Sequence, residues 1–181
     1  GTIVGDTIYY NGGAAAGINF PSRGHLRKGV INPADPTQIT WSIPHDNPGD
    51  KGYRMACASY NEKIFWIGGS GVTYNYNGIA YNGTGGVEPL DRILSYDTQD
   101  TLWLQSYGTP HRIMDLRGIA QLSSTQWMIC GGMGPGQEVL NEAFLLEYDP
   151  AAGQIAFGLN EAESETALKV YPNPVQRRLK L

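Results

Sequence analysis

Asp6-Thr-Ile-Tyr-Tyr-Asn-Gly12-Gly13 is the first of three segments in which an apolar run ends in a pair of glycines. The second copy is Glu62-Lys-Ile-Phe-Trp-Ile-Gly68-Gly69, and the third is Thr125-Gln-Trp-Met-Ile-Cys-Gly131-Gly132. The copies recur about every 60 residues, and such a period is typical of repeat architectures. Because glycine adopts a positive φ and lets backbones approach closely, we expect each pair to end a strand at a sharp, crowded turn.

Two further strand signals follow each glycine pair. They occupy residues 26–33 and 38–43 in the first copy, 91–97 and 101–105 in the second, and 142–150 and 154–157 in the third. Runs of β-branched and aromatic residues bounded by Gly, Pro, Asn and Asp indicate strands. With one strand before each apolar run, the pattern predicts four strands per repeat, which is the size of a propeller blade.

The aromatic residues resemble the kelch repeat, in which a Gly-Gly pair is followed by a Tyr and then, about seven residues later, by a Trp. Tyr96 and Trp103 match that spacing. Tyr148 and Phe157 match it with a two-residue insertion and Phe in place of Trp, and only Trp41 is clear in the first copy. The resemblance covers residues 1–158 and implies an all-β, kelch-type β-propeller of the galactose-oxidase-like group.

Three four-stranded blades are fewer than a closed propeller needs. We therefore expect either a partial propeller or half of a six-bladed ring, in which two copies form a homodimer through their open blade edges. Alignment of the repeats also suggests that the chain begins inside the first strand of a blade, so we expect a truncated N-terminal end.

Composition agrees with an all-β fold and narrows the partners. The 181 residues include 24 glycines, and only 17% are charged. A net charge of −4 lacks the basic surface that nucleic-acid binding needs, and no apolar run is long enough to span a membrane. Cys57 and Cys130 fit either buried thiols or a disulfide. His25, His45 and His111 lack metal-ligand spacing, so we expect neither a metal nor a cofactor.

The C-terminal end differs in character from the repeats. Residues 159–166 are polar and acidic, as in a linker. Residues 167–181 contain Val170-Tyr171-Pro172-Asn173-Pro174 followed by alternating apolar residues, which resembles the start of the C-terminal sorting domain of type IX secretion. The resemblance implies a protein at the outer surface of a Gram-negative bacterium or outside the cell, and it implies that the sorting domain is truncated here. An ordinary proline-rich turn between two strands is the alternative.

Arg54 and Arg117 begin equivalent first strands, so the repeat predicts that they point in similar directions. In kelch proteins this end of the blade lies at the mouth of the central channel, where two guanidinium groups could clamp a carboxylate or an anionic sugar. The alternative is that these arginines pair with acidic neighbours such as Asp50 and Asp115, or bond to loop carbonyls.

A long loop from Ser70 to Pro89 is rich in Tyr, Asn and Gly and nearly free of charge. Flat rings with polar edges suit sugar stacking, hydroxyl hydrogen bonds or a protein contact. The alternative is a loop that covers a neighbouring blade. The candidate ligand-binding residues are Tyr74, Asn75, Tyr76, Asn77 and Tyr81.

Together these features favour a recognition module that binds a glycan or a protein partner through its channel-face loops. A secreted carbohydrate-active enzyme that uses the arginine pair, with a loop acid such as Glu88, Asp91 or Glu142, is the second hypothesis, and a structural surface protein is the third. No catalytic residue can be assigned from the sequence. An enzyme should show a deep pocket with an acid or a histidine, whereas a binding module should show a broad aromatic face.

Overall fold

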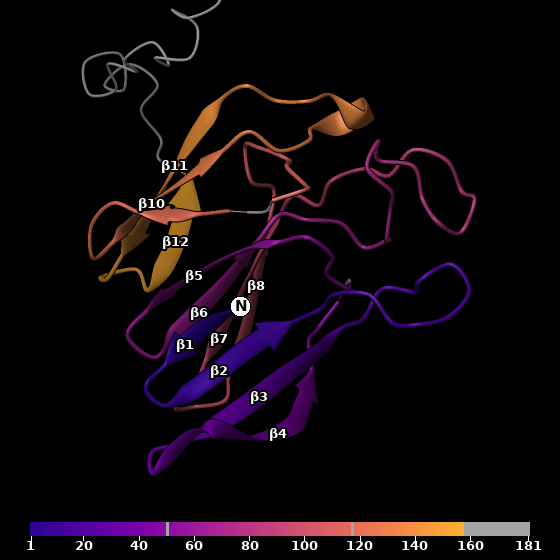
Figure 1. The fold of residues 1–181 in the computed structure, drawn as a ribbon. Helices are drawn as coiled ribbons and strands as arrows, with labels where there is room; N and C mark the ends of the chain where they lie inside the picture. Colours follow the sequence, from indigo (N-terminus) through magenta and orange to yellow (C-terminus); the bar gives the residue numbers. More distant parts are fainter. Residues whose placement is uncertain (50, 117, 158–181) are drawn as a thin grey trace, which may run out of the picture.

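Residues 1–49, 51–116 and 118–157 are described by a computed structural model of the protein. Arg117, Asp50, the expected linker 159–166 and the expected sorting segment 167–181 lie outside the described residues. The described chain is all-β and contains three four-stranded antiparallel sheets that follow one another along the sequence (Figure 1). The predicted four strands per repeat are therefore confirmed.

Each sheet is a meander in which every strand pairs with the next strand along the chain. The first sheet contains β1 (Thr2–Val4), β2 (Thr7–Asn11), β3 (His25–Asn32) and β4 (Asp35–Asp46). The second contains β5 (Ala56–Tyr60), β6 (Lys63–Ile67), β7 (Arg92–Asp97) and β8 (Trp103–Tyr107). The third contains β9 (Ala120–Gln121), β10 (Gln126–Cys130), β11 (Ala143–Asp149) and β12 (Gln154–Phe157), with the short 3-10 turn η1 (Pro135–Gln137) between β10 and β11. None of the described segments forms a helix with the length and apolar character that a membrane crossing requires.

The first two glycine pairs join one blade to the next. All six glycines have a positive φ, as expected. The N–H of Gly13 donates to the carbonyl of Gly52 at 2.7 Å, and the N–H of Gly69 donates to that of Ile113 at 2.9 Å, so these two pairs contact the chain that enters the following sheet. A Cβ on Gly68 would lie 2.3 Å from the Ile113 oxygen, which explains why no other residue fits there.

The sheets stack face to face through two apolar cores. Alternating side chains of each strand point to opposite faces, so one face of the second sheet meets the first sheet and its other face meets the third. Tyr9 and Leu26 of the first sheet pack with Trp66 and Tyr96 of the second. The other core is formed by residues of the second and third sheets, among them Ala58, Phe65, Ile67, Trp127, Ile129, Leu146 and Tyr148.

The Tyr–Trp signature has a direct structural meaning in the second sheet. Tyr96 lies opposite Trp103 across β7 and β8, with ring centroids 4.7 Å apart, and both rings belong to the core between the first two sheets. In the first sheet the same place is held by Gly29 and Trp41, and a Cβ on Gly29 would lie 2.8 Å from the indole. The tryptophan therefore occupies the space that tyrosine fills in the second sheet.

Tyr148 and Phe157, which match the kelch spacing with an insertion, do not lie opposite each other across β11 and β12. Tyr148 lies opposite Ile155, and Phe157 lies opposite Leu146. Counted from the glycine pairs, Leu146 and Phe157 hold the places that Tyr96 and Trp103 hold in the second sheet, so this hairpin is longer than the second one. Register is fixed by the turn that starts at Asp149 and ends at Gln154, which the choice of aromatic residue does not reveal.

Candidate functional site

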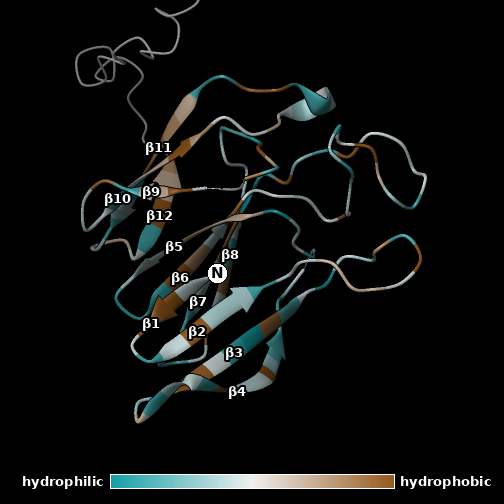
Figure 2. Cartoon of the chain, in the orientation of Figure 1, coloured by the Kyte–Doolittle hydropathy of each residue, from teal (hydrophilic) through white to brown (hydrophobic). Residues whose placement is uncertain are grey.

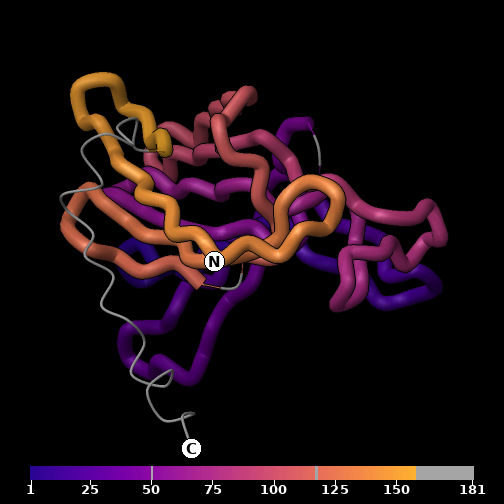
Figure 3. The backbone as a smooth tube through the Cα atoms, turned by 90° about the horizontal axis from the view of Figure 1, so that it is seen from above, coloured from indigo at the N-terminus to yellow at the C-terminus, as the bar shows by residue number. Residues whose placement is uncertain are grey.

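Three connecting loops project from the same side of the stacked sheets. They join β2 to β3 (residues 12–24), β6 to β7 (residues 68–91) and β10 to β11 (residues 131–142). The first two lie side by side in both the front and the top view (Figures 1 and 3). Loops held at one end of a rigid sheet stack are frequent positions for binding residues, so this loop face is the candidate site.

Arg54 is held by its neighbours at the base of this face. Its Nη1 donates to Oδ1 of Asp115 at 2.7 Å, and the guanidinium carbon lies 4.8 Å from the ring centre of Tyr74 and 5.0 Å from that of Tyr53. Partial burial disfavours the charged form, but the electrostatic effects of Tyr53 and Asp115 outweigh it and raise the pKa of Arg54. Arg54 thus pairs with an acidic neighbour, which was the alternative to an anion clamp, while Arg117 lies outside the described residues.

Tyr74 lies in a small core beneath the long loop rather than on its surface. Its side chain is fully buried, and its ring meets that of Tyr53 edge to face at 5.2 Å. The same core includes Ala80, and Met114 and Met133 of the third repeat. Burial raises the pKa of Tyr74 to about 12, with Asp115 adding to the shift and Arg54 opposing it. The inner half of the loop therefore covers a neighbouring blade, which was the structural alternative.

The outer half of the loop presents its side chains to solvent. Oδ1 of Asn75 accepts the N–H groups of Asn77 and Ile79, so Asn75 shapes the turn at the loop tip. Tyr76 is 83% exposed and Tyr81 is 40% exposed, and Asn77 is exposed as well. Of the predicted residues, Tyr76, Asn77 and Tyr81 are the ones placed to touch a ligand.

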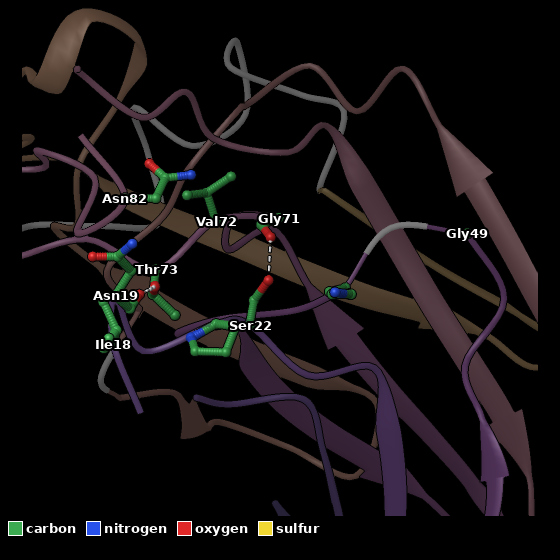
Figure 4. A pocket seen from close by; sticks show the side chains of 10 residues that line it. Ile18, Asn19, Ser22, Gly49, Gly71, Val72, Thr73 and Asn82 are labelled. Carbon is green, nitrogen blue, oxygen red and sulfur yellow. Dashed lines mark hydrogen bonds between the residues drawn. The ribbon is translucent and has the colours of Figure 1, made fainter. Parts of the chain in front are cut away.

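A pocket of about 600 Å³ lies between the first two loops, where they approach the chain that enters the second sheet (Figure 4). Two hydroxyl groups join the loops: Ser22 donates to the carbonyl of Gly71 and Thr73 donates to that of Phe20, each at 2.6 Å. These bonds hold the two loops at a defined separation. The pocket is lined by Ile18, Asn19, Pro21, Ser22, Gly49, Lys51, Gly71, Val72, Thr73 and Asn82.

An exposed aromatic pair stands beside this pocket. The rings of Phe20 and Tyr81 meet edge to face with centroids 5.1 Å apart, and each neighbours a lining asparagine in sequence, Asn19 and Asn82. Oδ1 of Asn82 accepts from the backbone N–H and the hydroxyl of Thr84, which fixes that amide side chain. Asn19 and Phe20 both have a positive φ, a strained conformation that is often kept at functional positions.

Neither the β2–β3 loop nor Lys51 was predicted from the sequence as part of a site. The signal was available, because this loop follows the first glycine pair just as the tyrosine-rich loop follows the second. What the sequence could not show is that Phe20 and Tyr81, which belong to different repeats, form one surface. This contact depends on the stacking of the first two sheets.

Acidic side chains near the loop face are mostly engaged in structural contacts. Glu88 accepts the backbone N–H of Gly136, and Asp91 lies 3.8 Å from Arg112. The described lining of the pocket contains no carboxylate and no imidazole. Among the described residues, no three His, Cys, Asp or Glu side chains are arranged to hold a metal ion. Cys57 and Cys130 are free thiols.

Three antiparallel meanders stacked through glycine turns define a partial β-propeller-like fold. Neither the family models nor the curated proteins that were compared give a match. Among solved structures, the chain is similar to that titled "Structure of YjhT", with a TM-score of 0.65 and 12% sequence identity. The match covers 86% of this chain and 43% of that chain, so the chain spans less than half the length of its structural neighbour. At this identity the likeness concerns the fold alone.

Proposed function

We propose that this chain is a kelch-type recognition module and that it binds a glycan through the pocket between the β2–β3 and β6–β7 loops. The observation that carries the proposal is the exposed Phe20–Tyr81 pair beside a pocket lined by amides, hydroxyl groups and Lys51. Sugar rings stack their C–H faces on aromatic side chains, and their hydroxyl groups exchange hydrogen bonds with amides.

A neutral glycan or one with a single negative charge fits the pocket better than a strongly anionic one. Lys51 is the one charged side chain in its described lining. Arg54, which would supply a second cation, is already paired with Asp115. The arginine clamp and the enzyme hypothesis that depends on it therefore have less support than simple binding, because the described lining also carries no acid or histidine for proton transfer.

A protein segment is the second candidate ligand, and a different set of side chains favours it. Ile18 is 90% exposed, Tyr76 is 83% exposed and Val139 is 79% exposed, so each of the three loops presents an apolar side chain to solvent. Exposed apolar groups on loops of one face suit a protein contact.

Placement at the outer surface of a Gram-negative bacterium, or outside the cell, is part of the proposal. It rests on the resemblance of residues 167–181 to a sorting domain. The measurement that tests it is cell fractionation of the native host with an antibody to this chain, and detection only in the cytoplasm would contradict it.

The binding proposal is tested by screening the purified chain on a glycan array and measuring the strongest hits by calorimetry. Phe20→Ala and Tyr81→Ala should each weaken binding by roughly tenfold or more, because stacking on a ring contributes about 1–3 kcal/mol. Leu104→Ala is the matched control, since Leu104 is 51% exposed on β8. If Tyr76→Ala alone abolishes binding while the other two variants bind normally, the ligand lies at the loop tip and not in the pocket.

A further inference from the structure

We propose that the outward face of the first sheet is an interface for the third sheet of a second copy of this chain. The outward face is the side of the first sheet that points away from the second sheet. It is independent of the loop pocket, and the inference goes beyond ligand binding. Its apolar members are Ile8, Tyr10, Ile31, Ile39, Trp41 and Ile43.

This face is apolar although it has no sheet against it among the described residues. Trp41 is 50% exposed, Ile43 is 57% exposed and Tyr10 is 36% exposed. Tyr10 and Trp41 meet edge to face with centroids 6.1 Å apart, and the guanidinium of Arg27 lies 5.0 Å from the Tyr10 ring centre. Figure 2 shows apolar bands on β3 and β4, which end the stack at this side.

The repeat itself indicates what covers such a face. Counted from the glycine pairs, the position of Tyr10 is held by Trp66 in the second sheet and by Ile129 in the third, and these side chains are only 2% and 0% exposed. Tyr9 and Leu26 of the first sheet cover Trp66. Phe65 and Ile67 of the second sheet share a core with Ile129. In both cases the cover is the opposite face of the preceding sheet.

The third sheet offers the matching surface at the other end of the stack. Met128 and Leu145 lie opposite each other on β10 and β11, on the side that alternates with the buried Ile129 and Leu146. Both are half-buried, and Glu147 is exposed nearby on β11. An apolar centre with a carboxylate at its edge complements the outward face, where Arg27 supplies the opposite charge.

Two copies arranged around a two-fold axis would form both contacts at once. Each copy would place its third sheet on the first sheet of the other, which gives six sheets in a closed ring. The match covers 43% of the structural neighbour, so the neighbour's chain has room for two such three-sheet units. This refines the expected pairing through blade edges: the contact we propose joins sheet faces, as the two contacts within the chain do.

Sedimentation equilibrium of the 181-residue chain tests the inference. We expect a mass of twice 19.7 kDa that falls to the single-chain value on dilution. Trp41→Lys and Leu145→Lys should each raise the dissociation constant roughly 30-fold or more, because each places an unpaired charge in the centre of the contact. Leu104→Lys, at an exposed leucine of the second sheet, should leave the dissociation constant unchanged.

An equimolar mixture of Trp41→Lys and Leu145→Lys gives a second, more specific readout. One of the two contacts in the mixed dimer joins an unaltered first sheet to an unaltered third sheet, so dimers should reappear although each variant alone is monomeric. Far-ultraviolet circular dichroism checks that both variants are folded. Should Trp41→Lys fail to fold, Ile43→Lys takes its place. A second replacement is the charge pair Arg27→Glu and Glu147→Arg: each change alone should weaken the dimer, and the two together should restore it.

Three outcomes would overturn the inference. The first is a chain that stays monomeric up to about 100 μM, a concentration well above that needed for a μM interface. The second is a dimer that Trp41→Lys does not weaken, which would place the contact elsewhere. The third is a mixture that stays monomeric, which would mean that the first and third sheets are not partners.

Discussion

Arg54 and Asp115 connect the approach to the second sheet with the approach to the third through a 2.7 Å ion pair. The two side chains are only 23% and 19% exposed, and the carbonyl of Arg54 also accepts the N–H of Leu116. The contact thus joins two repeats just below the loop face, and it holds the floor on which Tyr74 packs.

Asp115→Asn should lower the free energy of unfolding by about 1–2 kcal/mol, because it leaves a partly buried guanidinium without its counter-charge. Asparagine has the shape of aspartate and tolerates the positive φ at this position, so the variant reports the effect of removing the charge alone. Asp91→Asn is the control: its partner Arg112 lies 3.8 Å away and is 52% exposed, so a loss below about 0.5 kcal/mol is expected. Urea denaturation measures both, and equal losses would contradict the assignment.

High pH should destabilise the protein through Tyr74. Its pKa is raised to about 12 in the folded chain, against an ordinary value of 10.0, so the folded state favours the neutral phenol. The resulting stability is fully present below about pH 10 and is lost as the pH rises towards 12, by roughly 1–2 kcal/mol. Tyr74→Phe should remove this part of the pH dependence. If the free energy of unfolding falls equally steeply with pH in both proteins above pH 10, the pKa of Tyr74 is not raised by folding.

Gly68→Ala should lower the free energy of unfolding by at least about 2 kcal/mol, because the residue needs a positive φ and its Cβ would meet the Ile113 carbonyl. Gly5→Ala separates the two causes. Gly5 also has a positive φ, but a Cβ there meets nothing within 4 Å, so a loss of only about 1 kcal/mol is expected. Thermal denaturation monitored by circular dichroism compares the pair. Similar losses would mean that the close approach between blades is unimportant.

Trp103→Ala should cost about 3 kcal/mol of unfolding free energy, since the indole packs on Tyr96 and Trp66 in the core between the first two sheets. Trp41→Ala changes the corresponding residue of the first sheet, where the indole is half exposed. Its loss in the monomer should stay below about 1.5 kcal/mol, because less apolar area is buried. Chemical denaturation at a concentration low enough to avoid association makes the comparison valid.

Much of the fold was predictable because its signals are local and repeated. Three glycine pairs marked the ends of β2, β6 and β10, and strand-forming runs between turn residues marked the other strands. The cross-strand contact of Tyr96 with Trp103 also followed from a fixed spacing in a short hairpin. In the third hairpin the same reasoning selected Phe157, whereas the register placed Ile155 opposite Tyr148.

The candidate site was predictable only in part. The tyrosine-rich loop was predicted as a candidate site from its composition, but its sequence could not separate the buried Tyr74 from the exposed Tyr81. Burial depends on Met114 and Met133, which approach Tyr74 only after the second and third sheets have stacked.

The sequence by itself determined the strands, their turns and their fourfold grouping, because backbone preferences and alternation act over a few residues. Only the tertiary structure decided that Phe20 meets Tyr81, that Arg54 is paired with Asp115, and that Trp41 faces outward while Trp66 is buried. These outcomes depend on which sheet packs against which face. A side chain in one repeat is positioned by residues of another, and no local pattern carries that information.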